Sequence, residues 1–468
     1  MTMRGGRPKW RQLTGRDASV LTTRRKWLGL MLGPTAAAGV VGAMISCGLP
    51  SSGGAAVDIS KRKAKIAVSY HLTNVTEQTQ LLTGLVQKFR DKYPNITVEE
   101  VTDLGPQINE KVLALIAAGS PPDVMTLGYG GAGGAEDLAA RGALLKLDDL
   151  LKRDKAFKWE DFWPGVRLAG QFEGAQLALP YGGINAALMF YNKDLIGASG
   201  RSTPDQLFAK KSWNWDTLVE EATRLTKREP SGDLVQAGLG YPGELWTWTI
   251  ILLRSYGADY LNKDGTKVVI DSPQAVQALR VAQELSPRRR TMPLPAEGSS
   301  VDLVKAGKVA QAIYWMSAAS WWRPLSFDWD VAPTPAGPAG APARGGVNRL
   351  AISRETKEPE AAWAYCTFVL SPEMDAELSA SFGSMPLRQS SVAAWRRRMS
   401  GQKPKNLNLI EETAKALSLE PMRRPNPHLD DVDKLLRTEI AALLVNGKPP
   451  EQVVSAIATQ GNILLTTK

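Results

Sequence analysis

The chain has 468 residues, of which 43% are hydrophobic, so it is long enough for about two folded domains and too apolar for a disordered protein. Its net charge of +10 comes mostly from residues 1–46, which hold eight Lys or Arg and one Asp; the remainder holds 49 basic and 46 acidic residues. This near balance argues against a nucleic-acid-binding surface.

The N-terminal segment carries the features of an export signal. Arg24 and Arg25 precede an uncharged stretch over 27–45, and a small residue precedes Cys47. The paired arginines resemble a twin-arginine signal, and Ser46-Cys47 resembles a bacterial lipobox. These resemblances imply export, cleavage before Cys47 and a lipid on its thiol that holds the protein at the membrane surface, outside the cytoplasm. An uncleaved membrane-spanning helix over 27–45 is the alternative.

Residues 64–127 alternate between strand and helix patterns. Strands are predicted at 64–70, 96–101 and 123–127, with helices at 77–93 and 107–118 between them. This order predicts a parallel α/β sheet that binds ligands at the carboxyl ends of its strands. Those ends make His71, Asp103 and Tyr129 candidate ligand contacts.

The rest of the chain is richer in helices. Strands are predicted at 177–180 and 186–191, a loop at 332–344, and helices at 213–227, 244–256, 273–285, 361–370, 372–381, 431–445 and 451–465. No period of 20 to 50 residues recurs, which excludes a solenoid.

Catalytic and metal-binding signatures are missing from the sequence. His71 and His428, the two histidines, stand in no nucleophile signature, phosphate loop or paired metal-ligand spacing. Cys366 lies in a helical pattern and is expected to be a buried thiol. We therefore expect no catalytic residue, no metal and no cofactor.

Eight segments resemble, in order, the carbohydrate-binding members of the bacterial extracellular solute-binding proteins of ABC transporters, the family that includes maltose-binding proteins. They are 85–101, 108–127, 144–151, 179–196, 213–227, 265–279, 303–313 and 348–373. The resemblance implies an α/β periplasmic-binding-protein fold of type II, with two lobes that close on a sugar in the cleft between them. It also implies delivery of an oligosaccharide or glycoside to ABC permease subunits by a monomer.

The resemblance also implies how the chain is divided. The export signal covers 1–46 and a flexible tether covers 47–63. Residues 64–180 form the first part of lobe 1, and residues 181–345 form mainly lobe 2. Residues 346–468 supply crossing segments and C-terminal helices that the lobes share.

Two aromatic stretches suit a sugar, which needs flat apolar faces and planar polar groups. Glu244, Trp246 and Trp248 resemble an acidic and aromatic loop that lines a maltodextrin cleft. Trp315, Trp321 and Trp322 lie within eight residues, interrupted by Ser and Ala. The alternative for either stretch is that part of it belongs to the core, because tryptophans two apart cannot share one helical face.

The predicted crossing segments supply the remaining candidates. Tyr181 and Asn185 flank a Gly-Gly pair that suits a hinge, and Gly346 and Asn348 occupy a similar place later in the chain. Arg388 is placed in the site by the turn over 383–388.

Three other functions stay open at this stage. The protein could be a sensor subunit for a membrane signalling partner, a binder of a glycerol-phosphate ester, or a secreted hydrolase with a carboxylate pair.

Overall fold

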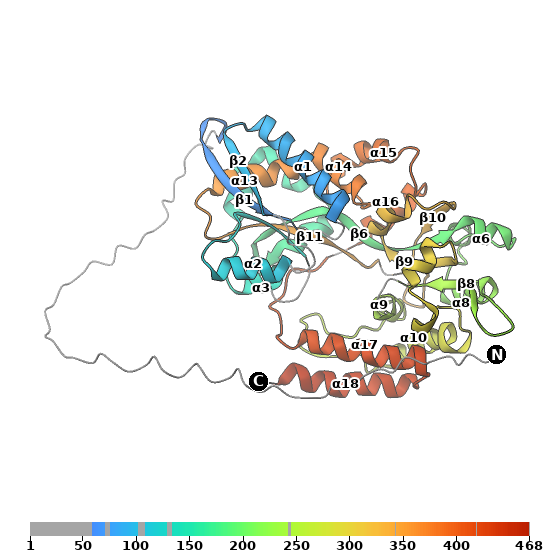
Figure 1. Cartoon of the computed structure of the whole chain (residues 1–468). Helices are drawn as coiled ribbons and strands as arrows, with labels where there is room; N and C mark the ends of the chain where they lie inside the picture. Colours follow the sequence, from blue (N-terminus) through green and yellow to red (C-terminus); the bar gives the residue numbers. More distant parts are fainter. Residues whose placement is uncertain are drawn as a thin grey trace, which may run out of the picture. The chain divides into compact units, whose positions relative to one another are not determined.

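The computed structural model describes residues 59–70, 75–101, 108–128, 133–241, 245–341, 343–417 and 419–467 (Figure 1). The predicted export signal, Cys47 and the first part of the predicted tether lie outside these residues. The end of that tether is ordered: Ile59–Lys61 form a 3-10 turn, η1, and Ile59 packs against the core. The partial burial of Ile59 attaches this turn, which lies within the predicted tether, to the hydrophobic core.

The strands and helices of the described residues follow the chain in a mixed α/β order. The strands are β1 (Ala64–Ser69), β2 (Ile96–Val101), β3 (Val124–Leu127), β4 (Gln171–Phe172), β5 (Ala175–Gln176), β6 (Ala178–Asn192), β7 (Lys227–Arg228), β8 (Leu234–Gly240), β9 (Val309–Trp315), β10 (Trp329–Ala332) and β11 (Gly345–Ile352). The helices before residue 260 are α1 (Val75–Lys92), α2 (Ile108–Ala117), α3 (Ala135–Ala140), α4 (Asp148–Arg153), α5 (Pro164–Arg167), α6 (Lys193–Ala198), α7 (Pro204–Ala209), α8 (Trp215–Leu225) and α9 (Leu245–Ser255). The later helices are α10 (Pro273–Gln283), α11 (Ser300–Lys305), α12 (Ala319–Trp322), α13 (Pro359–Val369), α14 (Pro372–Ser381), α15 (Val392–Met399), α16 (Leu407–Lys415), α17 (Leu429–Asn446) and α18 (Pro450–Thr466).

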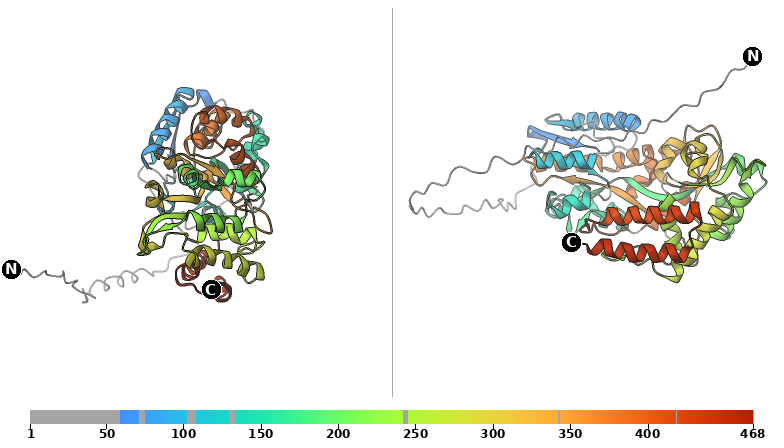
Figure 2. Two further views of the ribbon diagram at one scale, coloured as in Figure 1. Left: turned by 90° about the vertical axis from the view of Figure 1, so that its right-hand side faces the viewer. Right: turned by 60° about the horizontal axis from the view of Figure 1, so that its bottom comes forward.

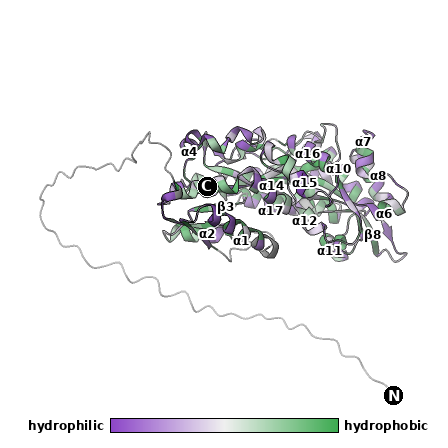
Figure 3. Cartoon of the chain, turned by 90° about the horizontal axis from the view of Figure 1, so that it is seen from above, coloured by the Kyte–Doolittle hydropathy of each residue, from purple (hydrophilic) through white to green (hydrophobic). Residues whose placement is uncertain are grey.

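The first part of the chain forms the predicted parallel sheet. β1 pairs in parallel with β2 on one side and with β3 on the other. Helix α1 follows β1 and carries both hydrophilic and hydrophobic residues (Figure 3). Leu82, Val86 and Phe89 are buried, whereas Gln87 and Lys88 are exposed. This confirms the strand and helix pattern predicted over 64–127.

Strand β6 is longer than predicted. The two strands expected at 177–180 and 186–191 are one strand of 15 residues, Ala178–Asn192. The Gly-Gly pair between them does not end the strand, because β11 pairs with it from Ala178 to Ala186 and keeps it extended. β6 therefore joins the two halves of the main sheet.

The main sheet has the strand order β2-β1-β3-β11-β6-β9-β8-β7 in the described part of the chain, and β10 pairs with the end of β6. The first half of β6 pairs with β11, while the second half pairs antiparallel with β9 and β10. One strand thus carries the backbone hydrogen bonds from one half of the sheet into the other.

Residues alternate along β6 between two hydrophobic clusters. Ala186, Leu188 and Phe190 face the cluster that also contains β1 and α13, whereas Ala187 and Met189 face the cluster that also contains α8 to α10, α17 and α18. Because side chains of a strand point to alternate faces, Asn185 lies on the same face as Ala187. The two helices predicted at 431–445 and 451–465 are α17 and α18, and they lie side by side (Figure 2).

No helix in the described ranges has both the length and the apolar character needed to cross a bilayer.

Candidate ligand-binding site

Three segments from distant parts of the sequence meet at the middle of β6. Gly346 of β11 pairs with Asn185, and Asn348 pairs with Tyr181. On the other side of the strand, the segment over 383–388 bonds to Ile184: the Ile184 N–H donates to the Met385 carbonyl (2.7 Å), and the Met385 N–H donates back (3.1 Å). The predicted crossing segments therefore lie together.

The glycines at this junction permit close packing. Gly182 and Gly183 have φ of 76° and 85°, a conformation that favours glycine. A Cβ on Gly183 would lie 2.2 Å from the Ser384 hydroxyl oxygen. The Ser384 hydroxyl also donates to the Gly182 carbonyl (2.8 Å), so the segment over 383–388 is tied to the backbone of β6.

Asn185 connects the junction to the turn that follows β9. Its Oδ1 accepts a hydrogen bond from the Ser317 N–H (2.9 Å), and its Nδ2 donates to the Ser317 hydroxyl (3.2 Å). Ser317 belongs to the 3-10 turn η7 (Met316–Ala318) directly after Trp315. This pair of bonds fixes the Trp315 end of β9 beside the crossing segments.

Trp315 and Arg344 lie in a row across β6. Trp315 pairs with Ala187, and the Ala187 N–H donates to the Arg344 carbonyl (2.7 Å). Directly paired residues of antiparallel strands share a face, so the small Ala187 side chain stands between the two larger ones. The Arg344 guanidinium carbon lies 5.6 Å from the centre of the Trp315 ring, which is cation–π geometry. Both side chains are half-buried.

Tyr260 and Asp433 belong to the electrostatic surroundings of Arg344. Loss of water around the guanidinium, with the charge of Arg254 as the second cause, lowers the pKa of Arg344 to about 10. Tyr260, Asp259 and Asp433 oppose this shift without cancelling it. The arrangement therefore combines an aromatic face, an amide and a poorly solvated cation at half-buried positions.

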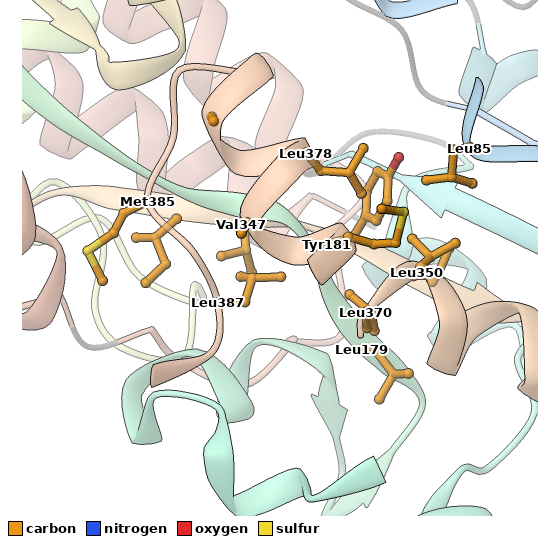
Figure 4. Packing of buried hydrophobic residues seen from close by; sticks show 14 of the residues in the cluster. Leu85, Leu179, Tyr181, Val347, Leu350, Leu370, Leu378, Met385 and Leu387 are labelled. Atoms are coloured by element: carbon orange, nitrogen blue, oxygen red, sulfur yellow. The ribbon is translucent and has the colours of Figure 1, made fainter. Parts of the chain in front are cut away.

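Tyr181, a predicted ligand contact, lies inside the hydrophobic core. It belongs to the cluster that also contains Leu179, Leu350, Leu370 and Leu378 (Figure 4). Burial raises the pKa of its hydroxyl well above the usual value. Tyr181 was predicted to contact the ligand, but its side chain lies in the hydrophobic cluster that also contains Ala186 and Leu188.

The predicted aromatic stretches divide between core and site. Trp322 is fully buried among the rings of Phe190, Tyr314 and Trp329, and Trp321 packs edge-to-face on Tyr314. Trp248 is also buried, 6.3 Å from the ring of Trp215. The alternative interpretation, that part of each stretch belongs to the core, therefore holds for Trp248 and Trp322. Among the predicted tryptophans whose side chains the structure describes, Trp315 is the one whose end of β9 is tied to Asn185 through Ser317.

Arg388 also has a structural environment rather than the predicted ligand-facing one. It is 2% exposed, and its guanidinium donates to the carbonyls of Leu370 (2.6 Å), Phe157 (2.7 Å) and Lys158 (3.2 Å) and to the Asp161 carboxylate (3.2 Å). Nearby, the Asp375 carboxylate accepts from the Leu387 and Arg388 N–H groups, and burial raises its pKa to about 6. These hydrogen bonds hold the segment over 383–388 in place.

The remaining predicted contacts divide between residues outside the described ranges and residues of the junction. His71, Asp103, Tyr129 and Glu244 lie outside the described residues, as does the side chain of Trp246. Gly346 and Asn348 lie in the junction, and the Asn348 amide nitrogen would be 3.8 Å from a Cβ on Gly182. Asn185, Trp315, Gly346 and Asn348 are thus the predicted residues that the structure brings together.

The sequence did not indicate Arg344, Ser317, Tyr260 and Asp433 as site residues. Arg344 directly precedes Gly345 and the predicted contact Gly346, and Ser317 lies within the tryptophan-rich stretch. Their position next to predicted site residues could therefore have indicated both. Tyr260 lies in the loop after α9, and Asp433 lies in α17. They are far from Arg344 in the sequence, and the tertiary fold brings them near it.

A family model described as bacterial extracellular solute-binding protein matches residues 73–376. The chain belongs to this family. A relative among curated proteins is "Putative ABC transporter periplasmic-binding protein YcjN" of Escherichia coli K12, 24% identical over 289 residues, which are 59% of this chain and 60% of that protein. The alignment with a Deinococcus radiodurans protein, "Probable ABC transporter-binding protein", is 25% identical over 226 residues and covers 46% of this chain and 52% of the relative.

Solved structures show the fold of this solute-binding protein. The ABC substrate-binding protein Lmo0181 of Listeria monocytogenes, in complex with cycloalternan, has a TM-score of 0.73 at 20% identity and covers 87% of this chain and 100% of its own. UgpB of Mycobacterium tuberculosis, in complex with glycerophosphocholine, has a TM-score of 0.70 at 19% identity, and the match covers 86% of this chain and 98% of UgpB. Maltose-bound MalE3 of T. maritima has a TM-score of 0.67 at 22% identity, and the match covers 86% of this chain and 100% of MalE3. The predicted two-lobed, type II periplasmic-binding-protein fold is confirmed.

Proposed function

We propose that this solute-binding protein is the substrate-binding component of an ABC importer, that it binds a carbohydrate beside the junction of the crossing segments, and that it delivers it to membrane permeases. The observation that carries the proposal is that Asn185 of β6, Trp315 at the end of β9 and Arg344 just before β11 lie near one another. The ring can stack on the C–H face of a sugar, and the amide and guanidinium can bind its hydroxyls.

The position of these residues suits a receptor that changes shape. Asn185, Gly346 and Arg344 lie in or next to the strands that connect the two halves of the sheet. A ligand held there contacts groups whose relative positions depend on the crossing segments, so binding can favour one arrangement of the lobes. We propose that the protein performs no covalent chemistry on the ligand.

We also propose that the protein is exported, cleaved before Cys47 and held at the membrane by lipid on that cysteine, as a monomer. The support is the arrangement of Arg24, Arg25 and Ser46-Cys47 in the sequence, together with membership of an extracellular family. Mass spectrometry of the protein from the membrane fraction should find a mature chain that starts at a lipid-modified Cys47. An unmodified chain that retains residues 1–46 would contradict this part of the proposal.

Ligand-dependent stabilisation tests the binding function. Neutral and acidic mono-, di- and oligosaccharides, polyols and glycerophosphodiesters are added to the purified protein, and the unfolding temperature is recorded. A ligand that binds only the native state adds about 2.7 kcal/mol of stability at a hundredfold excess over its dissociation constant. We expect a clear rise with one class of saccharide. A rise only with glycerophosphodiesters would favour that alternative ligand, and no rise in a folded protein would contradict the carbohydrate proposal.

A further inference from the structure

We propose that residues 419–425, here called the strap, limit how far the two halves of the fold can separate. The first half contains β1 to β3 with α2 and α3, and the second half contains β8, β9, α8 to α10, α17 and α18. The strap lies between α16 and α17, beyond the residues that the family model matches. This inference concerns the motion of the protein without ligand, so it goes beyond the proposed function and does not depend on it.

The strap is attached to the first half through Met422. The Met422 N–H donates to the Gln171 carbonyl (2.7 Å), and Met422 forms a parallel β-bridge with Phe172. The Met422 side chain is 4% exposed and belongs to the hydrophobic cluster of β3, α2 and α3. Arg424 pairs with Glu173 (2.6 Å), but both side chains are exposed, so this ion pair adds little. Met422 therefore provides most of the attachment.

The chain that follows the strap is attached to the second half. The Asn426 Nδ2 donates to the Leu465 carbonyl of α18 (3.2 Å), and the Asn426 Oδ1 accepts from the His428 N–H (2.9 Å). Helix α17 follows, and its buried Val432 belongs to the cluster of α8 to α10. Three residues thus separate Met422, which is fixed on the first half, from Asn426, which is fixed on the second.

The span between these two attachments is short and stiff. An extended chain covers at most about 3.6 Å per residue, so the Cα atoms of Met422 and Asn426 stay within about 14 Å while both are attached. Pro425 lies within the span, and Pro421 and Pro427 flank it. The proline ring fixes φ and favours extended backbone, so the span has little slack. A movement that draws the attachments apart must stop at this length or pull Met422 out of its cluster.

Such a restraint prepares the protein for binding. Strands β6 and β11 join the two halves within the main sheet, whereas the strap joins them between β4 and α18. Connections at two places restrict rotation of the halves more than one connection does. A receptor whose halves sample fewer arrangements loses less conformational entropy when it binds a ligand.

The test measures the distance between the halves in the full-length protein without ligand. Spin labels are attached at Glu110→Cys in α2 and Gln460→Cys in α18, both exposed positions. Cys47→Ser removes one native cysteine, and the other, Cys366, is buried. Double electron–electron resonance then gives the distribution of distances between the two labels.

Two variants release the strap in different ways. One carries Gly-Ser-Gly-Ser inserted between Arg424 and Pro425, which lengthens the span and leaves the attachment of Met422 intact. Its control carries the same insertion between Pro230 and Ser231, exposed residues that join β7 to β8 within the second half. The other variant, Met422→Asp, places a charge in the apolar cluster and so detaches the strap, and Met422→Leu is its control.

We expect the insertion in the strap to move the longest populated label distance outward by about 5 Å or more, because four added residues lengthen the span by up to about 14 Å. Met422→Asp should broaden the distribution in the same direction. Both controls should retain the wild-type distribution. The urea unfolding midpoint of each variant shows whether it is folded.

An unchanged distance distribution in the folded strap-insertion variant would overturn the inference, and so would an equal outward shift in the control insertion. Either strap variant decides the question if the other does not fold. Because the measurement uses no ligand, failure of every saccharide in the binding screen would overturn the proposed function and leave this result intact.

Discussion

Gly183→Ala is expected to destabilise the protein by about 3 kcal/mol. The φ of Gly183 is 85°, which an alanine adopts only with strain. Its Cβ would also lie 2.2 Å from the Ser384 Oγ, 2.8 Å from the Ser379 Oγ and 2.9 Å from the Met385 carbonyl oxygen. The backbone contact cannot be relieved by rotating a side chain, so β6 and the segment over 383–388 must move apart. Urea unfolding followed by tryptophan fluorescence measures the loss as a lower midpoint.

Gly84→Ala is the matched control for this substitution. Gly84 is exposed in α1, and a Cβ there would have no heavy atom within 4 Å. Alanine is the better helix former, so we expect a gain of about 0.5 to 1 kcal/mol. A Gly183→Ala midpoint equal to that of the wild type would show that the crossing segments are not tightly packed at this point.

Arg388→Met is expected to cost about 3 to 5 kcal/mol. Methionine fills a similar length, but it leaves the carbonyls of Leu370 and Phe157 without their donor in a buried place. It also removes the cation that lies 4.1 Å from the ring centre of Phe162 and the ion pair with Asp161. Urea unfolding followed by tryptophan fluorescence measures this loss of stability as a lower unfolding midpoint.

Arg280→Met provides the comparison for Arg388. The Arg280 side chain is 64% exposed and pairs with Glu451, which is also exposed, so its loss should cost less than about 1 kcal/mol. Arg388→Lys should remain strongly destabilised, because one ammonium group cannot replace the separate donors of a guanidinium. Equal midpoints for the Arg388→Met and Arg280→Met variants would refute the structural role given to Arg388.

The first α/β part of the fold was predictable because each of its elements has a local signal. Hydrophobic spacing marks α1, and Pro94-Asn95 marks the boundary before β2. The prediction of two separate strands around Gly182-Gly183 was wrong, because these glycines, which are typical of a break between strands, lie within the single strand β6. Pairing with β11, which comes from residues far along the chain, keeps that strand continuous, and no local pattern reveals it.

The site was predictable in composition and only partly in geometry. The sequence indicated a tryptophan-rich stretch, but it could not show that β9 ends at Trp315 and that Trp321 and Trp322 then pack with Tyr314 on the other face. It placed Arg388 near the cleft from its turn, although the donors of that residue are used within the core. Arg344 acquires its significance from Trp315, which lies on a different strand.

The central claim is that a carbohydrate binds beside Asn185 of β6 and Trp315 of β9. Repeating the ligand screen on Trp315→Ala and Trp159→Ala tests it most directly. Trp159 is also half-buried, but it packs against Phe157 in a different cluster from the one that Trp315 contacts, so its loss removes a tryptophan without touching this site. Loss of a stacking ring should weaken binding about tenfold. We predict that Trp315→Ala loses about half of the ligand-dependent stabilisation at a hundredfold excess over the wild-type dissociation constant, and that Trp159→Ala retains it in full. An equal rise in both variants would place the ligand elsewhere and contradict the site described for this protein.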